Sequence, residues 1–139
     1  MSNINVGRVI LGGLVAGLVI NIGETILNVV VLASEMEGML QARNLPVLGG
    51  SAIGGFVAFA FLLGIATVAL YAAIRPRFGP GAKTAVFAGL FVWYFAYFYS
   101  TTANVLMGFY ATKVAVVGLG WGLVEIVLAS VAGAWVYKE

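Results

Sequence analysis

Four long stretches of apolar residues dominate the chain, separated by short segments that hold most of its charged residues. They run over about residues 9–33, 53–74, 85–109 and 114–136. Each is at least as long as the roughly 20 helical residues that cross a 30 Å hydrocarbon layer. Lipid-exposed backbone must satisfy its own hydrogen bonds, and four such segments are too few to close a β-barrel. The pattern therefore predicts an all-α integral membrane protein with four transmembrane helices.

The connections between these stretches predict how the helices are arranged. Residues 75–81 include two prolines and two glycines, which predicts a sharp turn after the second helix. The connection at 110–113 is shorter still. Because short connections place consecutive helices side by side in opposite directions, we expect an antiparallel four-helix bundle. The whole chain, residues 1–139, forms one transmembrane domain in this interpretation.

The first connection is longer and has a pattern of its own. Ser34 and Glu37 have the spacing of a capping box, and Met36 and Met39 fall on one helical face. These features predict a short helix over about residues 35–43 that lies in the membrane interface. The methionines are interpreted as an oily surface rather than as metal ligands.

Basic residues gather in the segments that would share one side of the membrane. An even number of spans places both termini on the same side, and that side holds five of the seven basic residues. The positive-inside rule then predicts a multi-pass protein of the inner cell membrane with both termini in the cytoplasm. The five residues on that side are Arg8, Arg75, Arg77, Lys83 and Lys138, whereas Arg43 and Lys113 lie on the other side.

Weak internal similarity indicates a possible duplicated helical hairpin. The tripeptide at 16–18 recurs at 88–90, and the dipeptide at 28–29 recurs at 104–105. Two parallel copies of one hairpin would be related by an axis along the membrane normal. Coincidence is the competing interpretation in a sequence so rich in alanine, glycine and valine.

Glycines recur four residues apart in three of the predicted helices. Small residues at this spacing let helix backbones approach closely where no hydrophobic effect drives association in lipid. Packing within the bundle and association with further copies of the chain are both open interpretations. The three pairs are Gly13 and Gly17, Gly50 and Gly54, and Gly118 and Gly122.

Composition excludes several classes of function. The chain is 63% hydrophobic and only 9% charged, whereas soluble domains carry about 25% charged residues. It has no cysteine and no histidine, which removes disulfides, thiolate or imidazole metal sites and imidazole acid–base chemistry. A net charge of +2 is too weak and scattered for nucleic-acid binding. No nucleophile with an activating base is evident, so an enzyme is not the expected function, and no cofactor is indicated.

Polar residues inside the predicted spans form the candidate ligand- or ion-binding site. One group shares a face of the first helix, a second shares a face of the third, and a carboxyl lies near the middle of the fourth. In the predicted topology Glu24, Asn28, Thr101 and Asn104 fall toward the half of the bilayer opposite the termini, and Glu125 lies slightly deeper. The residues are Asn21, Glu24 and Asn28, then Tyr97, Thr101 and Asn104, and finally Glu125.

Two interpretations of this cluster remain open. Burial without a nearby Lys or Arg favours the protonated carboxyl unless a cation is present, so the site is expected to bind or transport a proton, a cation or an amphipathic small molecule. Glu24 would carry the charge, the asparagines would supply dipoles, and Tyr97 would form one wall. Alternatively, the glutamates only hydrogen-bond neighbouring helices, and the chain is an accessory subunit of a membrane complex or of a homo-oligomeric array. Membrane lipids are partners in both cases.

Three segments carry a family resemblance. Residues 75–85, 121–125 and 132–139 are similar to small four-span bacterial membrane proteins of uncharacterised function. This resemblance implies a four-span fold and no particular activity. In its size and its glutamate within the first span, the chain also resembles the small multidrug resistance transporters, although its longer first connection departs from theirs.

Overall fold

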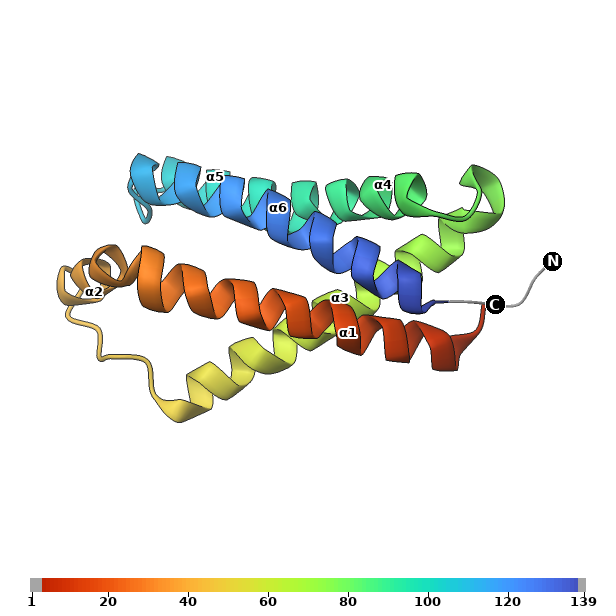
Figure 1. Cartoon of the computed structure of the whole chain (residues 1–139). Helices are drawn as coiled ribbons and strands as arrows, with labels where there is room; N and C mark the ends of the chain where they lie inside the picture. Colours follow the sequence, from red (N-terminus) through yellow and green to blue (C-terminus); the bar gives the residue numbers. More distant parts are fainter. Residues whose placement is uncertain (1–3, 138–139) are drawn as a thin grey trace.

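The structure, a computed structural model, describes residues 4–137 and is helical, with no strand in that range (Figure 1). Two segments are π-helical, with hydrogen bonds spanning five residues instead of four. In chain order the elements are α1 (Val6–Ile26), η1 (Leu27–Val31), α2 (Ala33–Gln41), α3 (Gly50–Phe78), α4 (Ala82–Val92), η2 (Trp93–Tyr99), α5 (Ser100–Leu106) and α6 (Thr112–Val136).

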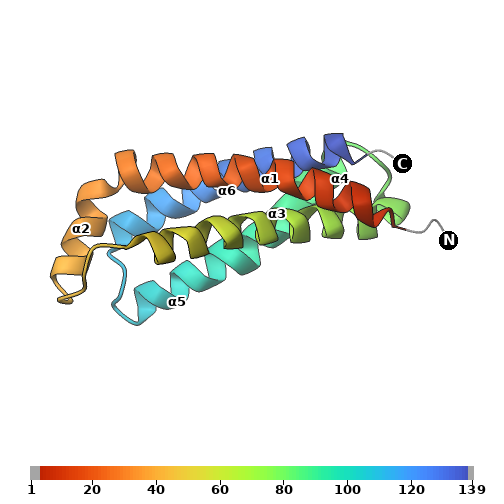
Figure 2. The ribbon, with the colours of Figure 1, turned by 90° about the horizontal axis from the view of Figure 1, so that it is seen from below.

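The long helices run up and down beside one another. Figures 1 and 2 show that α1 begins, and α6 ends, at the same end of the molecule as the connection between α3 and α4. We call this the termini end. The opposite end carries α2 and the connection between α5 and α6, and we call it the α2 end. Three helical segments, Val6–Val31, α3 and α6, are long and apolar enough to span a membrane.

The expected sharp turn at residues 75–81 begins later than predicted. Helix α3 continues through Pro76 to Phe78 and ends at Gly79, which has a φ of 84°. A proline in the last turn removes one backbone hydrogen bond, and the rest of a helix as long as α3 tolerates that loss. Glycine adopts the left-handed conformation that ends the helix without steric cost.

The expected capping box is wrong. Leu32 is the residue that precedes α2, and no side-chain hydrogen bond caps this end of the helix. The Ser34 hydroxyl does not accept from a backbone amide there but donates to the Glu35 carboxylate at 2.8 Å. Since η1 leads almost directly into α2, the Met36 amide already donates to the Leu32 carbonyl and needs no side-chain cap. The predicted helix at 35–43 is present, shifted two residues toward the N-terminus as Ala33–Gln41.

Tight packing is concentrated at the termini end. Buried apolar side chains from α1, α3, α4 and α6 meet there, and Val68 and Ile126 are fully buried. A Cβ on Gly13 would overlap Ile65, and one on Gly64 would overlap the backbone of α1. Small residues in these positions let α1 and α3 touch backbone to backbone. We call this region the termini-end core.

The predicted glycine pairs have different surroundings. Gly13 and Gly17 lie in the contact between α1 and α3, and Gly122 lies against the ring of Tyr97. A Cβ on Gly50, Gly54 or Gly118 would meet no atom within 4 Å. The α3 and α6 surfaces around these three positions are therefore open in the single chain.

A second, smaller apolar cluster lies at the α2 end. Buried Leu27, Leu32 and Val114 form its centre, and half-buried side chains pack around it. We call this the α2-end cluster; its half-buried members are Met36, Met39, Val117 and Trp121. It joins α2 to the beginning of α6.

Two polar contacts hold α2 over this cluster. The Lys113 ammonium on α6 lies 2.5 Å from the Glu35 carboxylate, and the Arg43 guanidinium donates to the Phe109 carbonyl at 2.5 Å. The Lys113 ammonium and the Ser34 hydroxyl lower the pKa of Glu35 from 4.5 to about 2.

The first testable prediction concerns the pH dependence of this contact. Because the pKa of Glu35 is lower in the folded chain, its contribution to stability is present above pH 4.5 and disappears as the pH falls toward 2. We expect the melting temperature of wild type to exceed that of Glu35→Gln by a small, constant amount between pH 5 and 8. The difference should vanish below pH about 2. A difference that persisted there would show that the carboxylate is not the source.

Candidate functional site

Glu125 is the most enclosed charged side chain that the structure describes, with 5% of its surface exposed. It lies midway along α6, between the termini-end core and the α2-end cluster. Its Oε1 atom accepts a hydrogen bond from the Tyr97 hydroxyl at 3.0 Å. Its Oε2 atom is buried and has no hydrogen-bond partner. A buried carboxylate oxygen is costly unless a proton, a donor or a cation compensates its charge.

Gly23 on α1 makes room for this carboxyl. A Cβ at that position would overlap Oε2 of Glu125, so the carboxyl can occupy its present place against α1 only because residue 23 has no side chain. One turn away on α6, the Trp121 indole donates to the Gly23 carbonyl at 3.1 Å. The unpartnered oxygen therefore faces the backbone of α1, beside a hydrogen bond that fixes the two helices together.

A second carboxyl lies next to this contact. Glu24 follows Gly23 on α1, is partly exposed, and accepts a hydrogen bond from the Asn28 side chain at 2.9 Å. The same Asn28 amide donates to the Glu24 backbone carbonyl at 2.8 Å. The Glu24 carboxyl is close enough to interact electrostatically with both Glu125 and Tyr97. Glu24, Asn28, Tyr97 and Glu125 thus form one polar site, which we call the carboxyl pair site.

The remaining predicted residues are not part of these contacts. The Asn21 side chain donates to the Gly17 carbonyl at 2.9 Å and to the Val57 carbonyl at 3.4 Å, so it links α1 to α3. Asn104 donates to the Ser100 carbonyl within its own helix at 2.8 Å. Thr101 is half-buried on α5. Residues that share a helix face can still contact different neighbours, because the face is wide enough to meet two helices.

Both π segments border the carboxyl pair site. Tyr97 belongs to η2, and Asn28 belongs to η1, which begins just after Glu24. A π turn holds an extra residue, so it rotates the side chains that follow relative to a regular α-helix. Single-turn π segments often occur at functional sites.

Sequence reasoning missed Gly23 and Trp121. Gly23 is adjacent to Glu24, and Trp121 is four residues before Glu125 and therefore on the same face of α6. That spacing could have indicated Trp121 as a neighbour of the site. The need for a glycine at position 23 depends on which residue of α6 lies opposite, and no pattern within one helix contains that information.

The carboxyl pair site has the chemistry of proton or small-cation binding. Two carboxyls in electrostatic contact within an apolar surrounding disfavour the doubly charged state, so one proton or one cation stabilises the pair. Within residues 4–137, no group of three Asp, Glu, His or Cys side chains is placed to hold a metal ion.

Over residues 4–137 the fold defines a class: a helical protein with three helical segments long and apolar enough to cross a membrane. No family model, no curated protein and no solved structure matches the chain.

Proposed function

We propose that the chain is a four-span membrane protein whose carboxyl pair site binds and exchanges protons, as the working part of a small proton- or cation-coupled transport unit. The observation that carries this proposal is the buried Glu125 with one carboxylate oxygen bonded to Tyr97 and the other unpartnered. Intramembrane acids of this kind are expensive to bury and typically belong to ion or proton pathways.

The fourth span in this proposal is the rod formed by α4, η2 and α5. Backbone angles stay in the right-handed helical region across both junctions, so residues 82–106 make one continuous helical path. At 1.5 Å per residue its length is about 35 Å, which is enough to cross the hydrocarbon layer. Lys83, at its beginning, is its charged residue. Together with the three long helices, it completes an antiparallel four-span bundle.

Basic residues support an orientation for this bundle. By the elements that carry them, Arg8, Arg75, Arg77 and Lys83 lie at the termini end, whereas Arg43 and Lys113 lie at the α2 end. Lys138, which the sequence also assigns to the side of the termini, lies outside the described residues. We propose on this basis that the termini end faces the cytoplasm of an inner-membrane protein and that α2 lies on the outer side.

Protonation of Glu125 would stabilise the carboxyl pair site in the folded chain. A neutral Glu125 carboxyl removes the charge that the unpartnered Oε2 would otherwise carry in an apolar surrounding. Loss of this proton becomes favourable when a bound cation, or a positively charged partner, neutralises the carboxyl pair in place of the proton. Competition between a proton and a cation for one carboxyl pair is the elementary step of coupled exchange.

The test is a proton flux assay on the chain reconstituted into liposomes with an imposed pH gradient. We expect the proton flux seen in wild type to be absent from Glu125→Gln. The glutamine amide keeps the shape of the glutamate carboxyl but does not bind and release a proton near neutral pH. Glu24→Gln should reduce flux to an intermediate level, since Glu24 is partly exposed and acts on Glu125 through its charge.

Glu37→Gln is the matched control, because Glu37 lies on exposed α2 and its carboxylate bonds only to Gln41 among the described contacts. It should retain the flux of wild type. Equal flux in Glu125→Gln and wild type would overturn the proposal, as would the absence of any flux above protein-free liposomes in wild type.

A second candidate function is an accessory subunit or a homo-oligomeric array. The open surface around Gly50 and Gly54 on α3 favours it, because close-packing residues that meet nothing in the single chain are suited to another helix. This candidate predicts no flux in wild type, together with loss of assembly in Gly54→Ile. The two functions therefore give opposite flux results.

A further inference from the structure

The surroundings of Glu125 differ sharply between its two sides along α6. Toward the termini end lie Ile126, Ala129 and Ser130, all fully buried in the termini-end core. The Ser130 hydroxyl is bonded to the Ala85 carbonyl at 2.6 Å, and a Cβ on Gly89 would press against Ser130. This side of the carboxyl is therefore tightly packed.

Toward the α2 end the packing is looser. The residues of α6 that continue the face of Glu125 are Trp121, Val117 and Val114, and the first two are only half-buried. They belong to the α2-end cluster, whose other members come from η1 and α2. Side chains such as Met36 and Met39 are flexible and adapt readily to changes in their surroundings.

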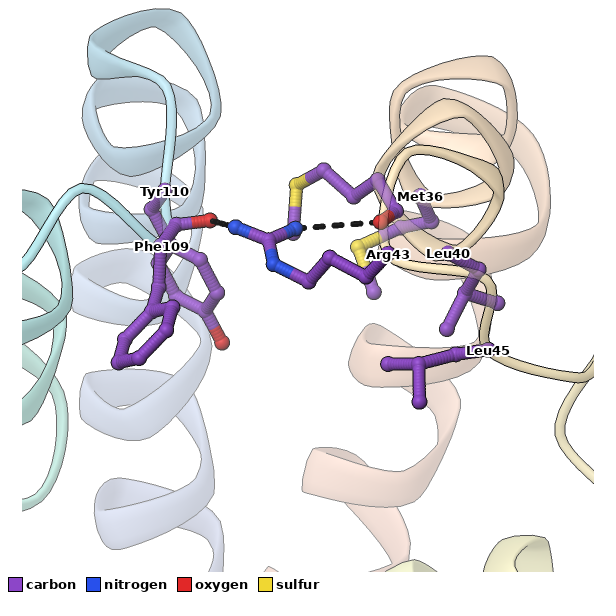
Figure 3. A pocket seen from close by; sticks show the side chains of 7 residues that line it. Met36, Leu40, Arg43, Leu45, Phe109 and Tyr110 are labelled. Atoms are coloured by element: carbon purple, nitrogen blue, oxygen red, sulfur yellow. Dashed lines mark hydrogen bonds between the residues drawn. The ribbon is translucent and has the colours of Figure 1, made fainter.

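Two adjoining hollows lie beyond this cluster. One is an open hollow of about 220 Å³, lined by side chains of α2, by Arg43 and Leu45 after it, and by the connection before α6. The other is a groove of about 600 Å³ that reaches Val114 and Glu35. Arg43, two residues after α2, lines both hollows, and Figure 3 shows it extending to the carbonyl of Phe109. The guanidinium also lies 5.7 Å from the centre of the Phe109 ring.

We infer that these hollows are the entrance through which the proton or cation reaches Glu125, and that α2 is the lid over this entrance. The inference rests on the proposed function, because it names the route to the same carboxyl pair. The α2-end cluster is the gate that separates the entrance from the carboxyl, and the termini-end core closes the opposite side.

The lid is held by few and exposed contacts. Three described contacts hold α2 and the residues after it against α6 and the connection before it. They are the ion pair of Glu35 with Lys113, the contacts of Arg43 with Phe109, and the α2-end cluster. Exposed ion pairs are weak and are screened by salt. Reversing one charge converts the attraction into repulsion and should shift α2 toward an open position.

The absence of cysteine from the sequence allows a direct test. A Val117→Cys variant in liposomes is treated with a water-soluble, membrane-impermeant methanethiosulfonate reagent. We expect slow modification, which becomes faster by on the order of tenfold when Glu35→Lys is added, because the closed lid loses an attraction and gains a repulsion. Adding Lys113→Glu to that variant restores the opposite charges and should restore slow modification.

Ala129→Cys is the matched control on the same helix, because Ala129 is fully buried in the termini-end core. Its modification should stay undetectable with either lid variant. Lys113→Gln removes the ion pair without a like-charge contact, so it serves if Glu35→Lys does not fold, and it should accelerate modification at Val117→Cys to a smaller extent.

Unchanged modification of Val117→Cys in both lid variants would overturn the lid, as would modification of Ala129→Cys at the same rate. These outcomes do not depend on transport, since labelling requires only access of the reagent. Persistent flux in Glu125→Gln would instead overturn the proposed function. The two failures are therefore distinguishable.

Discussion

A Gly64→Ile variant is expected to lose the packing of α1 against α3 and, with it, most of the bundle's stability. A Cβ on Gly64 would overlap the Gly17 amide and the Gly13 carbonyl, which are backbone atoms that cannot rotate away as a side chain would. The two helices must then separate along their length. We expect a loss of at least about 3 kcal/mol, at the upper end of the range for overpacked sites.

The measurement is unfolding in mixed detergent micelles, followed by tryptophan fluorescence as the fraction of SDS increases. Gly54→Ile is the matched control on the same helix, since a Cβ there meets nothing within 4 Å. It should unfold at nearly the same SDS fraction as wild type, because it introduces the same isoleucine side chain at a position where no neighbouring atom is overlapped. Equal destabilisation by both variants would show that α1 and α3 do not touch as described.

A Gly23→Ala variant is expected to disable the carboxyl pair site while leaving both carboxyls in the sequence. The added methyl would occupy the position of Oε2 of Glu125, and the carboxyl is the end of a flexible side chain that can move. The fold should therefore survive, while Glu125 loses its position near Tyr97 and Glu24. A changed interaction of about 1.4 kcal/mol alters proton affinity about tenfold, and we expect a fall in proton flux on the order of tenfold.

Flux and unfolding should be measured together for this variant. Gly118→Ala on α6 is the control, because the same methyl group added there meets no atom within 4 Å. Loss of flux in Gly23→Ala with an SDS unfolding curve close to that of wild type would support the proposed geometry. Wild-type flux in Gly23→Ala would contradict it, since the carboxyl cannot keep its present position beside a methyl group.

The positions of the helices could be predicted from the sequence, because the length of an apolar stretch depends only on consecutive residues. Each predicted span coincides with helix over most of its length, and the ends differ by a few residues. The capping box failed for a local reason as well: α2 follows η1 after a single residue, so the helix begins before Ser34. Neither π segment was predicted, because an extra residue per turn leaves no mark on a pattern of nearly uniform apolar residues.

The candidate site was predictable in part. Charged and amide side chains in an apolar span stand out by composition alone, and Glu24, Asn28, Tyr97 and Glu125 lie together in the structure. Asn21 and Asn104 are also amide side chains within apolar spans, but they donate to backbone carbonyls outside the carboxyl pair site. The direction in which a side chain on a helix face points depends on the neighbouring helix, and that neighbour is set by packing between distant segments.

What the sequence determined by itself is therefore the location of long apolar helices and the rarity of charge inside them, because both depend only on consecutive residues in contact with lipid or water. Tertiary structure alone decided which helix faces meet. Gly23 opposite Glu125, and Gly64 against Gly17, are contacts between residues distant in the chain. The physical reason is that close approach of two backbones depends on the shape of both surfaces at once, and a single helix carries only one of them.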